Sequence, residues 1–138
     1  MKLVDVTSSV EITLPSALLW EDEMEWNPTS AKTEYSLTGS LIFDSATKQT
    51  GRTITLSPPA NDMAWVPRST LLALKAWLSP PKRMMQLHLE DGSSRVFNVL
   101  FNHEKGALEG APVKGYPEYD DGTWYSLTLR LLEVPADF

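Results

Sequence analysis

The chain has 138 residues, of which 42% are hydrophobic and 22% charged, a composition that suits one folded domain with a single core. Its formal net charge of -6 disfavours nucleic acid as a partner, because an acidic surface repels the phosphate backbone. The absence of cysteine excludes disulfides, thiolate metal sites and thiol nucleophiles. No apolar run approaches the roughly 20 residues that cross a bilayer, and the N-terminus lacks the apolar segment of a signal peptide, so we expect no membrane association.

The first predicted elements are β-strands. Residues 10–14 alternate apolar and polar side chains before Pro15, which is typical of an edge strand because proline cannot donate to a ladder. Residues 35–43 alternate in the same way and are predicted as one strand that Gly39 interrupts. That glycine would mark a bulge, the bend of a small barrel, or a weak point in a surface strand.

A single helix is predicted next. Leu71, Leu74 and Leu78 recur at helical spacing and give the segment one apolar face. Pro67 suits the first turn, which needs no backbone donor, and two consecutive prolines stop the segment after Ser79. The pattern predicts a helix over about residues 67–78 whose apolar face packs in the core.

Two further strands and a long final strand complete the predicted order. Residues 85–89 and 97–101 alternate on either side of Asp91-Gly92, a hairpin turn signal. Residues 124–134 begin with alternation and end apolar on both faces, which predicts a central strand or one covered by another subunit. The fold class is therefore mainly β: a small β-barrel or β-sandwich with one covering α-helix, forming a single domain over residues 1–138.

The acidic segment 20–26 is the first candidate functional stretch. In a strand, Trp20 and Trp26 would share a face with Asp22, and the glutamates would form a solvated stripe behind them. The segment lacks the glycine and alternating oxygen donors of a calcium loop, so we expect no metal site. Trp20 and Trp26 are instead predicted at a protein contact, because tryptophan often anchors interfaces.

The segment 115–124 is the second candidate stretch. Its aromatic residues among acids and turn formers permit a glycan-binding interpretation, although Asp121-Gly122 is also a common hairpin turn signal. Tyr116, Tyr119 and Trp124 are therefore predicted either as subunit contacts or as the site of a self-contained binding module.

An enzymatic function is not expected. His88 and His103 lie outside any hydrolase motif, and the glycine-containing loop at 105–112 lacks the Gly-Lys-Ser/Thr of a phosphate cradle. A small hydrolase using Asp22, Glu25 or Asp120 ranks last, because no nucleophile, base and orienting group can be named together. We expect no catalytic residues, no cofactor and no metal.

Four stretches of the sequence carry a family resemblance. They are Gly51-Arg52-Thr53-Ile54-Thr55-Leu56, Trp65-Val66-Pro67-Arg68, Leu87-His88-Leu89-Glu90-Asp91-Gly92 and Arg95-Val96-Phe97-Asn98-Val99. In this order of strand, helix and turn, the chain resembles the N-terminal domain of distal tail proteins of long-tailed bacteriophages over roughly residues 35–134. The resemblance implies a β-barrel or sandwich with one helix, assembled as a hexameric ring between the tail tube and the host-binding tip.

The same resemblance implies partners and a location. The partners would be further copies of the chain, the tail tube protein, and the tape-measure and tip or hub proteins. The protein would reside in the virion tail, and in the host cytoplasm during assembly. Larger family members add a C-terminal carrier domain, for which this chain has no room, so a minimal ring-forming subunit is expected. An acidic balance suits a ring around a DNA path, because like charge keeps the duplex from sticking.

Overall fold

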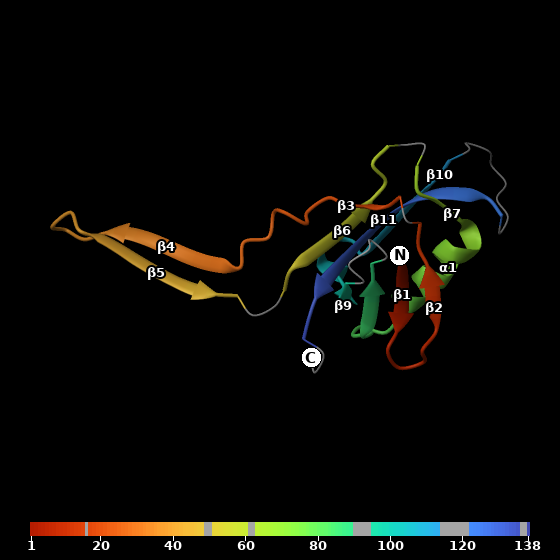
Figure 1. Cartoon of the computed structure of the whole chain (residues 1–138), viewed down its shortest axis with the longest axis horizontal. Helices are drawn as coiled ribbons and strands as arrows, with labels where there is room; N and C mark the ends of the chain where they lie inside the picture. The colour runs from red at the N-terminus through yellow and green to blue at the C-terminus, as the bar shows by residue number, and fades with distance from the viewer. Residues whose placement is uncertain (16, 49–50, 61–62, 90–94, 114–121, 136–137) are drawn as a thin grey trace.

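The computed structural model is a mainly antiparallel β protein with one α-helix, and a long hairpin projects from its body (Figure 1). It describes residues 1–15, 17–48, 51–60, 63–89, 95–113, 122–135 and 138. The prediction of a mainly β fold with a single covering helix is confirmed.

Nine strands form the main sheet. They are β1 (Lys2–Asp5), β2 (Glu11–Thr13), β3 (Leu19–Trp20), β6 (Thr53–Ser57), β7 (Trp65–Pro67), β8 (Met85–His88), β9 (Val96–Phe101), β10 (Leu108–Pro112) and β11 (Trp124–Glu133). Their order is β2-β1-β8-β9-β11-β6-β3, with β7 and β10 also pairing with β11. Within the described residues no ladder joins β2 to β3, so the sheet is not closed into a barrel, and the barrel form of the prediction is not supported.

Strand β11 organises the sheet, because it pairs with β6, β7, β9 and β10. Its side chains alternate between the core and the outer face, and Tyr125, Leu127, Leu129 and Leu131 are buried. The prediction of a central final strand is confirmed. The edge position predicted for residues 10–14 is also confirmed, since β2 lies at the end of the sheet order.

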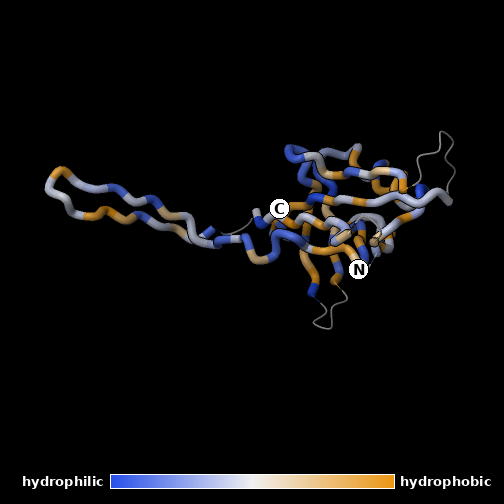
Figure 2. The backbone as a smooth tube through the Cα atoms, turned by 90° about the horizontal axis from the view of Figure 1, so that it is seen from above, coloured by the Kyte–Doolittle hydropathy of each residue, from blue (hydrophilic) through white to orange (hydrophobic). Residues whose placement is uncertain are grey.

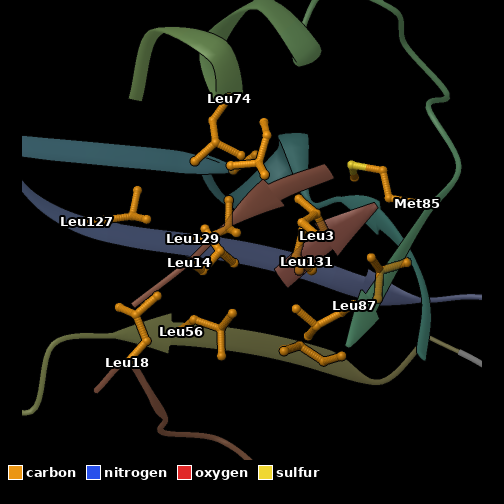
Figure 3. Packing of buried hydrophobic residues seen from close by; sticks show 14 of the residues in the cluster. Leu3, Leu14, Leu18, Leu56, Leu74, Met85, Leu87, Leu127, Leu129 and Leu131 are labelled. Carbon is orange, nitrogen blue, oxygen red and sulfur yellow. The ribbon is translucent and has the colours of Figure 1, made fainter. Parts of the chain in front are cut away.

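The helix α1 (Arg68–Trp77) follows β7 directly, and Pro67 stands at its N-cap position. Leu74 is fully buried, and Figure 3 shows it reaching from the helix toward leucines of β1 and β11. Leu71 and Leu78 pack against the same core while remaining partly exposed. The helical spacing read from the sequence therefore identified the buried face. A short 3-10 helix, His103–Lys105, precedes β10.

The core lies between the sheet and the helix. Leu3 and Leu87 oppose one another in the β1–β8 ladder, and both are fully buried together with Met85 (Figure 3). Burying each such side chain stabilises the fold by about 1.5–3 kcal/mol relative to leaving it exposed. No residue of the projecting hairpin belongs to this core.

The segment predicted as one strand over residues 35–43 instead contains the end of β4 (Thr29–Tyr35), a turn at residues 36–40 and the start of β5 (Leu41–Thr47). Gly39 lies in that turn with a φ of 83°, a left-handed conformation that glycine adopts without strain. The single-strand prediction was wrong because Tyr35 pairs with Leu41 across the turn. Paired residues point to the same face, so the alternation continues through the turn as if no turn were present.

Candidate functional site

The hairpin formed by β4 and β5, residues 29–47, is the most unusual surface of the molecule, and we call it the arm. It extends away from the body, and among the described residues its two strands pair only with each other (Figure 1). All seven residues of each strand are exposed. At about 3.4 Å per residue, each strand spans about 24 Å. The arm therefore projects well beyond the body, and in the described part of the chain no sheet or helix lies beneath it.

The arm has two chemically different faces, because directly paired residues in a ladder share a face. The face that we call the uncharged face carries Thr29, Ala31, Thr33, Tyr35, Leu41, Phe43, Ser45 and Thr47. The opposite face, the charged face, carries Ser30, Lys32, Glu34, Ile42, Asp44 and Ala46. Lys32 and Glu34 form an ion pair of 2.6 Å there. All ionisable groups of the two strands except the Tyr35 phenol thus lie on one face.

Large apolar side chains gather at the outer end of the uncharged face. Tyr35, Leu41 and Phe43 are 78%, 57% and 59% exposed, and Leu37 in the turn is fully exposed. The pairing of Tyr35 with Leu41 is the last before the turn, and Figure 2 shows hydrophobic colouring at the far end of the arm. Monomeric soluble proteins rarely expose contiguous apolar patches larger than a few hundred Å², and larger patches mark interaction sites.

The base of the arm is fastened to the body by backbone and side-chain bonds. The Gly51 N–H donates to Glu133 O at 3.0 Å, and the Glu133 N–H donates to Arg52 O at 2.8 Å. The Arg52 guanidinium donates to Glu23 O at 2.8 Å and lies 4.5 Å from the centre of the Trp20 ring. Since Glu133 is the last residue of β11, the arm leaves the body at the C-terminal end of that strand.

The two legs of the arm also meet each other before the hairpin begins. The Lys48 N–H donates to Pro28 O at 2.6 Å, and the Lys48 ammonium lies 4.8 Å above the Trp26 ring. A cation over an indole ring contributes about 0.5–1 kcal/mol at an exposed site. These contacts close the hairpin at its base and leave its outer part without support from the body.

The tryptophans predicted at a contact lie at this base. Trp20 is only 8% exposed and belongs to the core, with the Phe97 ring packed edge-on at 5.4 Å. Trp26 is half-buried beneath Lys48. Residues 21–25 form turns rather than the strand considered from the sequence. Trp20 therefore packs beneath Arg52 at the base of the arm, and it is not part of the exposed surface.

A second aromatic surface lies at the opposite end of β11, and we call it the tryptophan face. Trp124 is 48% exposed and Trp65 is 38% exposed. Trp65 pairs with Ser126, and Trp124 pairs with Pro67, so all four side chains lie on the outer face of the β7–β11 ladder. Tyr116 and Tyr119, predicted at contacts beside Trp124, lie outside the described residues.

Beside the tryptophan face lies an open hollow of about 500 Å³. Its lining consists of Leu108, Glu109, Gly110, Ala111, Ser126 and Thr128. The only ionised group in this lining is the Glu109 carboxylate, which pairs with Arg130 at 2.7 Å. Among the described residues, the hollow and the tryptophan face thus offer aromatic, aliphatic and hydroxyl groups, with one carboxylate that is already paired.

The acidic candidates for catalysis have structural surroundings. The Asp22 carboxylate is buried and accepts hydrogen bonds from the Thr55 N–H at 2.9 Å and the Thr55 hydroxyl at 3.0 Å. Glu25 is exposed, and Asp120 lies outside the described residues. His88 is half-buried in β8, and His103 is exposed in the 3-10 helix. Over the part of the chain that the structure describes, no three His, Asp or Glu side chains gather as a metal site would require.

The exposed apolar residues of the arm were missed in the sequence interpretation. Their signal was present: between Thr33 and Phe43, alternate positions carry no charge and include Tyr35 and Leu41. The alternation predicts one strand interrupted by Gly39, because periodicity alone does not distinguish a continuous strand from a hairpin. Only the pairing of Tyr35 with Leu41, and the absence of a layer beneath that pair in the described chain, identifies the face as an external surface.

Comparison with known proteins adds no family assignment. No protein-family model, curated protein or solved structure matches the chain. Within the described residues, no helix has both the length and the apolar character needed to span a membrane.

Proposed function

We propose that this protein is a structural component of a bacteriophage tail tip or baseplate, a ring-forming distal tail protein that joins the tail tube to the host-binding tip. The observation that carries the proposal is the arm, an amphipathic hairpin that leaves the body and exposes Tyr35, Leu41 and Phe43. Its partners would be further copies of this chain, the tail tube protein, and the tape-measure and hub proteins. It would act in the virion tail after assembly in the host cytoplasm.

The arm supports an assembly function because a hairpin without packing partners has low stability. An isolated two-stranded hairpin is marginally stable in water and gains stability when it packs on another element. Among the described residues, neither outer edge of the arm pairs with a further strand. Open edges of this kind invite pairing with another chain unless they are covered. A partner that packs on the uncharged face would supply the missing packing, and a strand of that partner placed beside β4 or β5 would also pair the open edge.

A catalytic function has weaker support in the geometry. Catalysis needs groups that converge on one reacting atom, with at least one hydrogen-bonded pair of nucleophile and base. Both carboxylate oxygens of Asp22 instead accept hydrogen bonds from Thr55, and Glu25 is exposed on a turn. The features that stand out are broad contact surfaces rather than a convergent pocket.

The alternative is a self-contained binding module for a glycan or protein at the 116–124 segment. The observation that favours it is Trp124, half-exposed beside an open hollow with hydroxyl groups from Ser126 and Thr128. An exposed indole next to hydroxyl donors can stack on a sugar ring. This function predicts a monomer that loses ligand binding when Trp124 is replaced by alanine.

The two functions are separated by the native mass of the purified protein over a wide concentration range, measured by light scattering and native mass spectrometry. Rings in electron micrographs and a discrete oligomer would support the tail-tip proposal. A variant in which residues 29–47 are replaced by a short Gly-Ser linker should keep the folded body, because no arm residue belongs to the core, and should remain monomeric. A monomer at every concentration for the unmodified chain would refute the ring.

A further inference from the structure

We propose that the uncharged face of the arm docks on the tryptophan face of a second copy of this chain, so that successive copies join head to tail. This inference rests on the proposed ring-forming function and adds the two surfaces that meet. The arm contributes Tyr35, Leu41 and Phe43, and the receiving copy contributes Trp65 and Trp124 with the neighbouring hollow.

The two surfaces lie at opposite ends of the molecule. The base of the arm is bonded to Glu133, and the tryptophan face begins at Trp124, the other end of the ten-residue strand β11. At about 3.4 Å per residue, these ends are separated by about 30 Å. Figure 1 shows the arm pointing away from the body, with β7 and β10 on the far side. The arm therefore extends away from the tryptophan face of its own chain, and that of a neighbour remains available to it.

The chemistry of the two surfaces matches. Neither the uncharged face of the arm nor the outer positions Trp65, Pro67, Trp124 and Ser126 carry an ionised group. Apolar and aromatic residues are enriched at the centre of interfaces, where charged residues are depleted. Glu109 lies at the hollow already paired with Arg130, so docking would leave no lone carboxylate there. The charged face of the arm, with Lys32 and Asp44, would remain toward solvent.

The area of the arm indicates how much of the contact it can supply. Two buried aromatic side chains, those of Tyr35 and Phe43, remove about 300–500 Å² from water. A stable interface takes about 800 Å² from each partner, so contacts between the bodies must supply the remainder. In a head-to-tail arrangement each copy gives one arm and receives one. Such a heterologous contact closes into a ring when the rotation between neighbours permits it.

Cross-linking between two singly substituted chains tests this docking, since the natural sequence has no cysteine to interfere. Thr33→Cys places a thiol on the uncharged face, and Ser126→Cys places one on the tryptophan face. The two proteins are mixed and treated with a short bismaleimide, which can join them only between molecules. Lys32→Cys, one residue away on the charged face, is the matched control.

The expected result is at least tenfold more cross-linked heterodimer from the Thr33 and Ser126 pair than from the Lys32 and Ser126 pair. Adding Trp124→Ala to the Ser126 variant should lower the yield by a similar factor without changing its melting temperature. Equal yields from Thr33 and Lys32 would overturn the assigned face. If the unmodified chain forms oligomers but the Thr33 pair does not cross-link, the docking inference fails and the ring proposal stands. If the chain is also monomeric throughout, both fail.

Discussion

Replacing Phe43 by alanine should weaken assembly while leaving the folded body intact. The side chain is 59% exposed in the single chain, so its removal costs little there, within the roughly 0.5 kcal/mol typical of surface substitutions. If a neighbouring copy buries the ring, the loss is about 1.5–3 kcal/mol for each contact. Since about 1.4 kcal/mol corresponds to a tenfold change in an equilibrium constant, association should weaken by about 10- to 150-fold per contact.

The assay compares sedimentation equilibrium of the unmodified and Phe43→Ala proteins, with thermal unfolding of both measured at a concentration where they are monomeric. Ile42→Ala is the control, because Ile42 is 44% exposed and lies on the charged face of the same strand. Association constants that are equal for the unmodified and Phe43→Ala proteins would refute the reasoning. So would a loss from Ile42→Ala as large as that from Phe43→Ala, because the effect would then not depend on the face.

Three further predictions concern the monomer. Gly110→Ala should destabilise the fold by about 1 kcal/mol in a denaturant titration, because the added Cβ would lie 2.7 Å from Leu71 Cδ2 and that side-chain end must shift. If this contact is the cause, Gly110→Ala should cost less when it is measured in a Leu71→Ala background. Gly39→Ala, at a φ of 83° with no atom within 4 Å of the new Cβ, should cost about 1 kcal/mol in the arm alone, so hydrogen exchange should quicken in β4 and β5 while the melting temperature of the body stays constant. Asp5 is buried, which by itself raises its pKa, but hydrogen bonds from the Thr7 N–H and the Ser8 side chain, together with the charge of Arg83, hold the pKa below its ordinary value. Its stabilising contribution is therefore full above the unfolded pKa of about 3.9 and declines as the pH falls through the folded pKa. Asp5→Asn should lower the stability near neutral pH and flatten the acid limb of the stability profile, and an unchanged acid limb would contradict this account.

The sequence predicted several of the elements whose side chains meet the core. Leu74 and its neighbours showed the helical period because one face of α1 is buried, and Leu127, Leu129 and Leu131 showed the strand period because one face of β11 is buried. Burial selects apolar residues at the repeat of the element, so the pattern can be read without a structure. The missing backbone N–H of proline likewise predicted the start of the helix at Pro67 and the edge position of β2 before Pro15.

Strand pairing and tertiary packing decided the remainder, because periodicity records which face is apolar but not what covers it. The alternation around Gly39 is the same whether the segment is one strand or a hairpin, and only the ladder between Tyr35 and Leu41 distinguishes them. Trp20 and Trp124 are both tryptophans beside acidic turns in the sequence, yet one is 8% and the other 48% exposed. Long-range packing set that difference, since Arg52 and Phe97 cover Trp20, whereas Trp124 lies on the outer face of β11. The local sequence thus determined the type of each element and its apolar face, and the tertiary fold determined which of these faces are exposed as contact surfaces.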